Sequence, residues 1–291
     1  MSVILPAILP VFIMALLGFA LAKSGRAMDG GTTAFLVATV GTPALVFSNL
    51  ATTPFNSGTL LSLAAATGIA IAFYLAVGAI ALKASGLKLR TYLPSLAFPN
   101  AGNLGLPLAL YAAGQEGLND AIIIFAVTSI VNMTAGQVIA AGRGNWGRAL
   151  RSPIIPAVAL GVMCAYFGVT LPLWLTNTLS LLSGLTIPLM LLMLGTSLAK
   201  IQVTGFPRAA GLSVLRISMG TVAGFVLAGA FGFVGPERVA FVLQCAMPVA
   251  VYNYLFAQMY DNDPEDVASL VIVSTVLSVV TTPILLAVLV P

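Results

Sequence analysis

Long apolar runs follow one another along this chain with only short links between them, and this pattern decides what the chain can fold into. A helix needs about 20 apolar residues to cross the hydrocarbon core of a bilayer. The ten runs that meet this requirement are 3–22, 33–50, 59–82, 91–113, 119–141, 153–169, 172–199, 209–233, 237–260 and 267–290. Only 7% of the residues are charged, against roughly a quarter in a soluble domain. The sequence therefore predicts an all-α membrane protein with ten transmembrane helices and the lipid bilayer, not a nucleic acid, as its partner.

The first apolar run has an alternative interpretation as a secretory signal, because Ala20-Leu21-Ala22 resembles a cleavage site. However, residues 1–10 contain no Lys or Arg, so the basic region that begins a signal peptide is missing. The run is also longer than the usual apolar core of a signal. We expect it to be the first transmembrane span.

The basic residues predict the orientation of the chain. Ten of the twelve lie in links that follow odd-numbered spans: Lys23, Arg26, Lys83, Lys88, Arg90, Arg143, Arg148, Arg151, Lys200 and Arg208. On the opposite side lies only Arg238, while Arg216 lies within the eighth span. Because cytoplasmic loops are enriched in Lys and Arg, we expect both termini on the outer side of the plasma membrane, the inner membrane of a bacterium.

Three prolines recur in order at nearly one spacing, which indicates an internal repeat. The pairs are Pro10 with Pro156, Pro43 with Pro188 and Pro99 with Pro248, at shifts of 146, 145 and 149 residues. The alternative is chance, since the chain has 17 prolines. The spacing predicts a first five-helix repeat over 1–141, a cytoplasmic link over 142–152 and a second repeat over 153–291. An odd number of spans per repeat makes the two repeats insert in opposite directions, as in many alternating-access transporters.

Two of the predicted spans contain helix-breaking residues near their middle. The fourth span reads FPNAGNLGLPL over 98–108, with two prolines and two glycines, and the ninth has Pro248 followed by Tyr252 and Asn253. A break in hydrocarbon is tolerated only where it is buried in protein or lines a wet cavity. Paired breaks in two halves of a transporter indicate its substrate site.

Each break exposes the N-terminus of a half-helix, with free N–H groups and partial positive charge, so two such ends meeting in the membrane would attract an anion. We therefore predict substrate contacts from Asn100, Asn103, Tyr252 and Asn253. Their carboxamides can hold a carboxylate without a buried full charge. The alternative is that the asparagines only satisfy loosened backbone.

Four further polar residues within spans are candidates for ion binding or for supporting the site: Gln244, Thr128, Asn132 and Arg216. Ser129 and Gln137 belong to the same polar stretch as Thr128. Hydroxyls in membrane helices often bond only their own backbone, and Arg216 has the alternative of extending along the helix to the interface. The chain has no histidine, and all its acids fall in links or at span ends. This argues against a metal site and against a proton relay, and leaves sodium coupling or uncoupled transport open.

Several motifs, in order along nearly the whole chain, resemble the auxin efflux carrier family, which includes plant auxin exporters and bacterial malonate-type permeases. They are LPVF at 9–12, TPALVFSNLA at 42–51, PN at 99–100, GLPL at 105–108, GTSLAKI at 195–201, QCAMP at 244–248 and FAQMY at 256–260. The resemblance implies two inverted five-helix repeats, divided into a scaffold and a moving transport domain. It also implies that helices 4 and 9 cross at mid-membrane at Pro99 and Pro248, beside a site for an organic anion. Asn100 matches the asparagine that follows the proline in the family.

The chain departs from the plant members at three places. Val249 stands where they often carry Gln, Gln258 and Met259 stand where they carry a Lys-Glu pair, and only about ten residues join spans 5 and 6. The departures favour a compact bacterial-type member over an auxin carrier.

These observations predict a secondary transporter that moves a small organic anion by alternating access. The alternatives are a ten-helix carrier of the drug/metabolite type, or a channel, for an uncharged or cationic solute. An intramembrane enzyme would need paired acids, a zinc motif or a Ser-His pair, so we expect no enzyme activity. The sequence leaves the substrate and the direction of transport open, as well as the oligomeric state, for which a homodimer is one option.

Overall fold

The computed structural model describes residues 4–25, 29–52, 57–142, 153–200 and 203–290. Within these ranges the chain is helical apart from its links, and its sole β-type pairing is an isolated bridge between Pro99 and Val249. The prediction of an all-α protein is therefore confirmed. The predicted link 142–152 lies outside the described residues except for Gly142.

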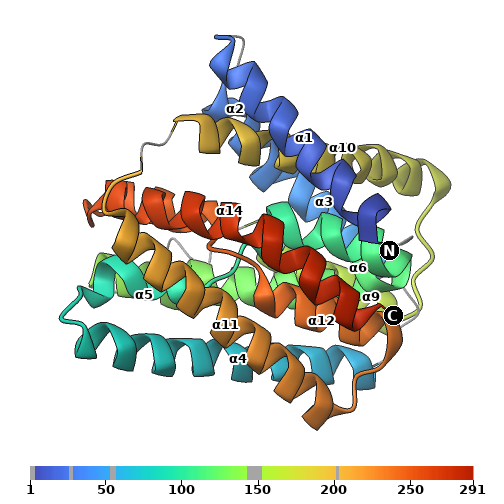
Figure 1. Cartoon of the computed structure of the whole chain (residues 1–291). Coiled ribbons are helices and arrows are strands. Elements are labelled where there is room, and N and C mark those ends of the chain that lie inside the picture. The colour runs from blue at the N-terminus through green and yellow to red at the C-terminus, as the bar shows by residue number, and fades with distance from the viewer. Residues whose placement is uncertain (1–3, 26–28, 53–56, 143–152, 201–202, 291) are drawn as a thin grey trace.

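One group of helices, which we call the panel, is α1 (Ile4–Lys23), α2 (Gly30–Leu36), η1 (Val37–Gly41), α3 (Thr42–Thr52), α9 (Ile154–Tyr166) and α10 (Leu173–Lys200). Within the panel, α1 packs along α10, and α3 packs against α9 and α10. Figure 1 shows α1, α2 and α10 together at one face of the molecule.

The second group, which we call the crossing helices, is α4 (Ser57–Ala84), α5 (Leu89–Ala97), η2 (Ala101–Gly105), α6 (Leu106–Val131), η3 (Asn132–Gly136), α7 (Gln137–Ala141), α11 (Phe206–Phe231), α12 (Gly235–Ala246), α13 (Val251–Met259) and α14 (Pro264–Leu289). Here α12 packs on α6 and α11, and α11 packs on α14 and α4. In Figure 1, α1 begins and α14 ends at the same end of the helices.

Six helical stretches in the described part of the chain are long and apolar enough to cross a membrane, and two shorter apolar helices, Ile8–Lys23 and Ile154–Tyr166, accompany them. The protein is thus a multi-pass helical membrane protein. Predicted spans 4 and 9 do not reach spanning length as single helices, because each is divided into two half-helices. The full set of ten spans in two inverted repeats stays a prediction.

The break in span 4 falls at Pro99, whereas Pro107 causes none. Phe98 has an extended backbone (φ −113°, ψ 107°) and ends α5. The chain stays helical around Pro107, because α6 continues directly from the π-helical turn η2 at Gly105. The extended backbone that interrupts span 4 therefore lies at Phe98 and Pro99, and Pro107 belongs to the helix that follows the break. A second interruption lies at Gly114 inside α6, whose backbone (φ 67°, ψ −162°) suits glycine alone.

Candidate functional site

The two broken helices cross at their breaks and are joined there by backbone hydrogen bonds. The Asn100 N–H donates to the Pro248 carbonyl at 2.7 Å, and the Ala250 N–H donates to the Phe98 carbonyl at 3.4 Å. These bonds satisfy backbone groups that the breaks release, which apolar surroundings require. The structure therefore brings Pro99 and Pro248 together, and four half-helix ends meet around them.

A cavity of about 400 Å³, which we call the amide cavity, lies against the two N-terminal ends. Gly102 and Asn103 line it from the first turn of η2, and Val251 and Tyr252 line it from the first turn of α13. The first N–H groups of a helix lack partners within it and carry partial positive charge. The cavity is thus positioned to receive an anion, although none of its described lining residues is charged.

Carboxamide side chains around the crossing hold buried polar atoms for which the described residues offer no hydrogen-bond partner. They are Asn100 Nδ2, Asn132 Oδ1, Gln137 Oε1, Asn253 Oδ1 and both side-chain polar atoms of Gln244. Asn100, Asn132 and Gln137 also line the amide cavity. Buried polar groups are nearly always paired, so such a concentration marks a place where a ligand or water completes the bonding.

Three π-helical segments also border the amide cavity. Residues of η1, η2 and η3 all contribute to its lining, among them Val37, Gly102 and Asn132. A π-helical turn widens the helix by one residue and is frequent at functional sites. The three segments therefore bring irregular helical backbone to the wall of the amide cavity.

The predicted site residues divide between the cavity and the protein interior. Asn100, Asn103, Tyr252, Thr128 and Asn132 line the amide cavity, as Ser129 and Gln137 do. Asn253 does not: its Nδ2 donates to the Phe98 carbonyl at 3.1 Å and ties the two broken helices together. Gln244 does not line it either, but lies buried against Gly105.

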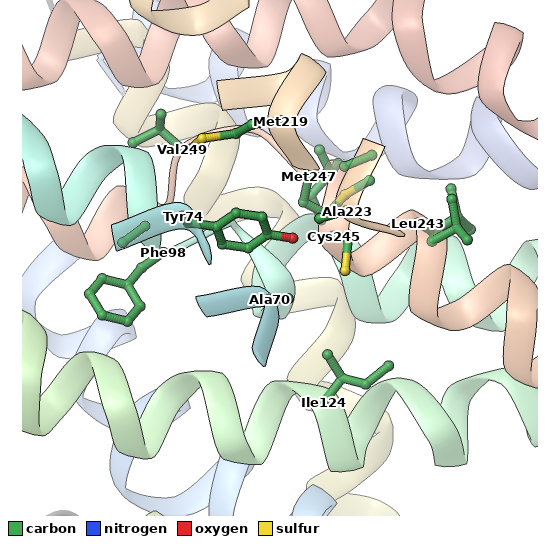
Figure 2. Close-up of a cluster of buried hydrophobic side chains, with 14 of the residues drawn as sticks. Ala70, Tyr74, Phe98, Ile124, Met219, Ala223, Leu243, Cys245, Met247 and Val249 are labelled. Atoms are coloured by element: carbon green, nitrogen blue, oxygen red, sulfur yellow. The ribbon is translucent and has the colours of Figure 1, made fainter. Parts of the chain in front are cut away.

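Arg216, on α11, is fully buried on a part of the crossing that does not line the amide cavity. It lies ten residues into α11, or about 15 Å along the helix axis, so extension to the interface would need a turned-out side chain. Instead its guanidinium lies 4.4 Å from the centre of the Tyr74 ring and donates to backbone carbonyls of the two broken helices. Figure 2 shows the Tyr74 ring pointing toward the chain around Cys245 and Met247.

A second cavity of about 480 Å³, which we call the acidic cavity, lies between the panel and the crossing helices. Asn49 of α3 and Ala165 of α9 line it, together with the carboxyl groups of Glu116, Asp120 and Glu237. No described lining residue is basic. The two cavities therefore differ in charge, and an anion meets repulsion in one and partial positive charge in the other.

A buried apolar cluster separates the two cavities. Along α3, Thr42 lines the amide cavity and Asn49 lines the acidic one, with Leu45 and Val46 buried between them. These two side chains belong to a cluster with Leu106, Ala109, Leu118, Ala121 and Ile122 of α6, Ile154 of α9 and Ala240 of α12. Such a cluster offers no polar path between the cavities for a solute.

Comparison of the sequence with known proteins identifies the family of this chain. The model of a family described as membrane transport protein, the auxin efflux carrier family, matches residues 3–149 and 143–286. The chain belongs to this family. The family is one of membrane transport proteins, not of enzymes.

Three relatives are similar over long stretches. An uncharacterised transporter of Methanocaldococcus jannaschii is 27% identical over 62% of this chain and 61% of its own length. An uncharacterised transporter of Methanothermobacter thermautotrophicus is 30% identical over 65% of this chain and 64% of its own. The matches therefore span less than two thirds of these two proteins. A protein of Rhizobium meliloti, provisionally named a malonate transporter, is 25% identical over 94% of this chain and 92% of its own length.

The sequence did not single out the panel side of the amide cavity. Thr42 of α3 and Met190 and Met193 of α10 line it, yet they lie in apolar runs with no local sign of a site. The one available signal was the proline pair Pro43 and Pro188, which lies beside these residues in the sequence. Which faces of α3 and α10 turn toward the crossing depends on tertiary packing.

Proposed function

We propose that this transporter carries a small organic anion with a carboxylate group, and that the anion binds in the amide cavity. The observation that carries the proposal is the convergence of two half-helix N-termini on one uncharged cavity, with Asn100 between them. Each N-terminus contributes roughly half a positive charge, so the pair complements one carboxylate. The provisional name of the Rhizobium meliloti relative supports malonate as the first substrate to test.

The other lining residues fit the remainder of such a molecule. Asn132 and Gln137 have buried oxygens free to accept a hydrogen bond from a hydroxyl or a protonated carboxyl group, while Phe125, Met190 and Met193 offer apolar contact. A pocket of this size with few placed polar groups is typical of small-molecule sites. Because no described lining residue is charged, recognition rests on helix ends and neutral amides.

We further propose that transport follows alternating access, with the panel as scaffold and the crossing helices as the moving domain. In the described conformation the amide cavity borders Ala34 and Pro153, which follow the predicted basic links. By the distribution of Lys and Arg, this cavity would open to the cytoplasm of a bacterial cell. The apolar cluster around Leu45 and Ile122 would then close the outer path.

Contacts between repeat-related residues support the proposal of ten spans in two inverted repeats. A Cβ atom at Gly41 would lie 2.6 Å from Thr186 Oγ1, and Pro99 pairs with Val249. Residues 41 and 186 are related by the predicted shift of 145, and Val249 directly follows Pro248, which the shift of 149 relates to Pro99. Residues on the pseudo-twofold axis of inverted repeats would meet their own equivalents in this way.

Uptake of labelled malonate into vesicles that contain the purified protein tests the proposal. We expect saturable uptake, faster when the vesicles are preloaded with unlabelled malonate, because a carrier returns faster when loaded. Asn100→Ala should lose most of this uptake, while Asn177→Ala, a change at an exposed position of α10, should not.

Undiminished uptake by Asn100→Ala would refute the placement of the site. Uptake that does not respond to preloading would point to a channel. If neither malonate nor other carboxylates enter, the substrate belongs to the uncharged or cationic solutes.

A further inference from the structure

Two of the four half-helix ends at the crossing are C-termini, and their carbonyl groups converge on one side chain. Arg216 Nη1 donates to the Leu96 carbonyl at 2.9 Å, and Nη2 donates to the Cys245 carbonyl at 2.6 Å. Its Nε donates to the Met247 carbonyl at 3.4 Å. Leu96 lies in the last turn of α5, Cys245 lies in the last turn of α12, and Met247 is the residue that caps α12.

These carbonyls are the ones that a helix leaves unpaired. The last carbonyls of an α-helix have no intrahelical donor and carry about half a negative charge per helix end. Two such ends together present about one negative charge, which one guanidinium balances. The guanidinium is always protonated and presents its N–H groups in a fixed planar fork.

The residues packed around Arg216 allow the close approach of its guanidinium to these carbonyls. Gly220, one turn further along α11, faces the Cys245 carbonyl so closely that a Cβ atom there would overlap it. Tyr74 of α4 covers the guanidinium with its ring at 4.4 Å, an arrangement that favours a cation. Helices α4, α5, α11 and α12 therefore all contribute to one enclosed cation position.

In transporters with discontinuous helices, the C-terminal half-helix ends and the unwound carbonyls are where a coupling ion such as Na⁺ binds. Here a side chain already occupies that position. We propose that Arg216 is a built-in replacement for the coupling cation, so that this protein neither binds nor needs Na⁺ at its helix crossing.

The expected independence of uptake from Na⁺ rests on the proposed function, because it assumes that the anion is taken up through the amide cavity. The expected absence of Na⁺ binding at the crossing does not rest on the proposed function, because it concerns the contacts of Arg216 alone. The two can be tested separately by measuring uptake and thermal stability on the same preparations.

The first measurement needs no substrate. The melting temperature of the purified wild-type protein is recorded in NaCl and in choline chloride at equal ionic strength. We expect no difference. In Arg216→Ala, which leaves the carbonyls open, Na⁺ or low-millimolar guanidinium should raise the melting temperature in a saturable way. Arg238→Ala, a change at an exposed arginine, should respond to neither ion.

The second measurement is malonate uptake in the same two salts. Wild type should take up malonate equally in both, and Arg216→Lys, which keeps the charge, should retain most of its uptake. Arg216→Met should lose more than about tenfold, the effect expected when hydrogen bonds to a charged group are removed. Guanidinium should restore part of the uptake of Arg216→Ala.

A saturable rise in the wild-type melting temperature with Na⁺ would overturn the proposal, and so would wild-type uptake that depends on Na⁺. Both results come from the wild-type protein and do not require the variants to fold. Folded Arg216→Ala that responds to neither ion would also overturn it. Melting data as expected, without uptake of any carboxylate, would support the cation role of Arg216 and reject the proposed substrate.

Discussion

The two faces of the helix crossing differ in how completely their polar groups are satisfied. On the face with the C-terminal ends, Arg216 pairs with carbonyls of Leu96, Cys245 and Met247 and is sealed from solvent. On the face with the N-terminal ends, Asn100 Nδ2 is buried without a partner among the described residues, next to a cavity of about 400 Å³.

This difference in hydrogen bonding assigns a structural role to one face of the crossing and a binding role to the other. A satisfied buried network gives a site a fixed geometry, whereas unsatisfied buried groups cost stability that a ligand can recover. The face of Arg216 therefore holds the two broken helices in register, and the face of Asn100 keeps its bonding capacity for a substrate. The predictions below concern the sealed face, the region between the two faces and a position far from both.

The largest loss of stability is expected from Gly220→Ala on the sealed face. The added methyl group would overlap the Cys245 carbonyl, so α11 must move away from α12 and weaken the bond from Arg216. Overpacking of this kind costs about 1–3 kcal/mol. Thermal unfolding in detergent measures the loss. Gly211→Ala on the same helix, where the methyl group meets open space, is the matched control and should leave the melting temperature unchanged or slightly raised.

A gain of stability is expected from Gln244→Met, between the two faces. Both polar atoms of the Gln244 carboxamide are buried without a partner in the described structure, and an apolar side chain of similar shape removes that penalty, on the order of 1 kcal/mol. The melting temperature should rise, whereas it should not rise in Gln258→Met, an exposed control. A fall in Gln244→Met would show that the amide is already satisfied in the protein.

The smallest effect is expected far from both faces, at the ion pair that joins the start of α5 to the start of α14. Lys88 Nζ and Thr91 Oγ1 donate to Asp263, and these bonds hold the pKa of that carboxyl below its ordinary value of 3.8. A lowered carboxyl pKa stabilises the fold above the unfolded-state pKa, and the contribution disappears as the pH falls through the folded-state pKa.

Lys88→Met should therefore lower the melting temperature slightly near neutral pH. Lys88 is mostly exposed, so the loss should be at most about 1 kcal/mol. The difference between Lys88→Met and the wild type should vanish once the pH is well below the ordinary pKa of the carboxyl. A difference that persists in strong acid would assign the effect to packing of the lysine stem.

The sequence was sufficient to predict the breaks and several residues beside them. Pro99 and Pro248 remove backbone donors wherever they stand, so their consequence could be predicted locally. Asn100 and Asn103 could be placed at the site because they adjoin a break. Pro107 looked the same in the sequence, but the chain is helical on both sides of it, and no local signal distinguishes the two prolines.

The partners of Arg216 could not be predicted from the sequence. The carbonyls it binds belong to residues 120, 29 and 31 positions away, and backbone carbonyls carry no sequence signal. The π-helical segments were also missed, since Val37–Gly41 and Asn132–Gly136 read as parts of regular transmembrane helices. In both cases tertiary packing selects the geometry.

The most direct test of the central claim is to place a carboxylate at the N-terminal face by Asn100→Asp, which keeps the side-chain size, and to measure the melting temperature with and without malonate. A tethered anion should occupy the positive ends of η2 and α13. We therefore predict a melting temperature above that of the wild type in the absence of malonate, and no further rise when malonate is added, whereas the wild type rises. A variant that is stabilised by malonate as strongly as the wild type would contradict the assignment of this face as the anion site.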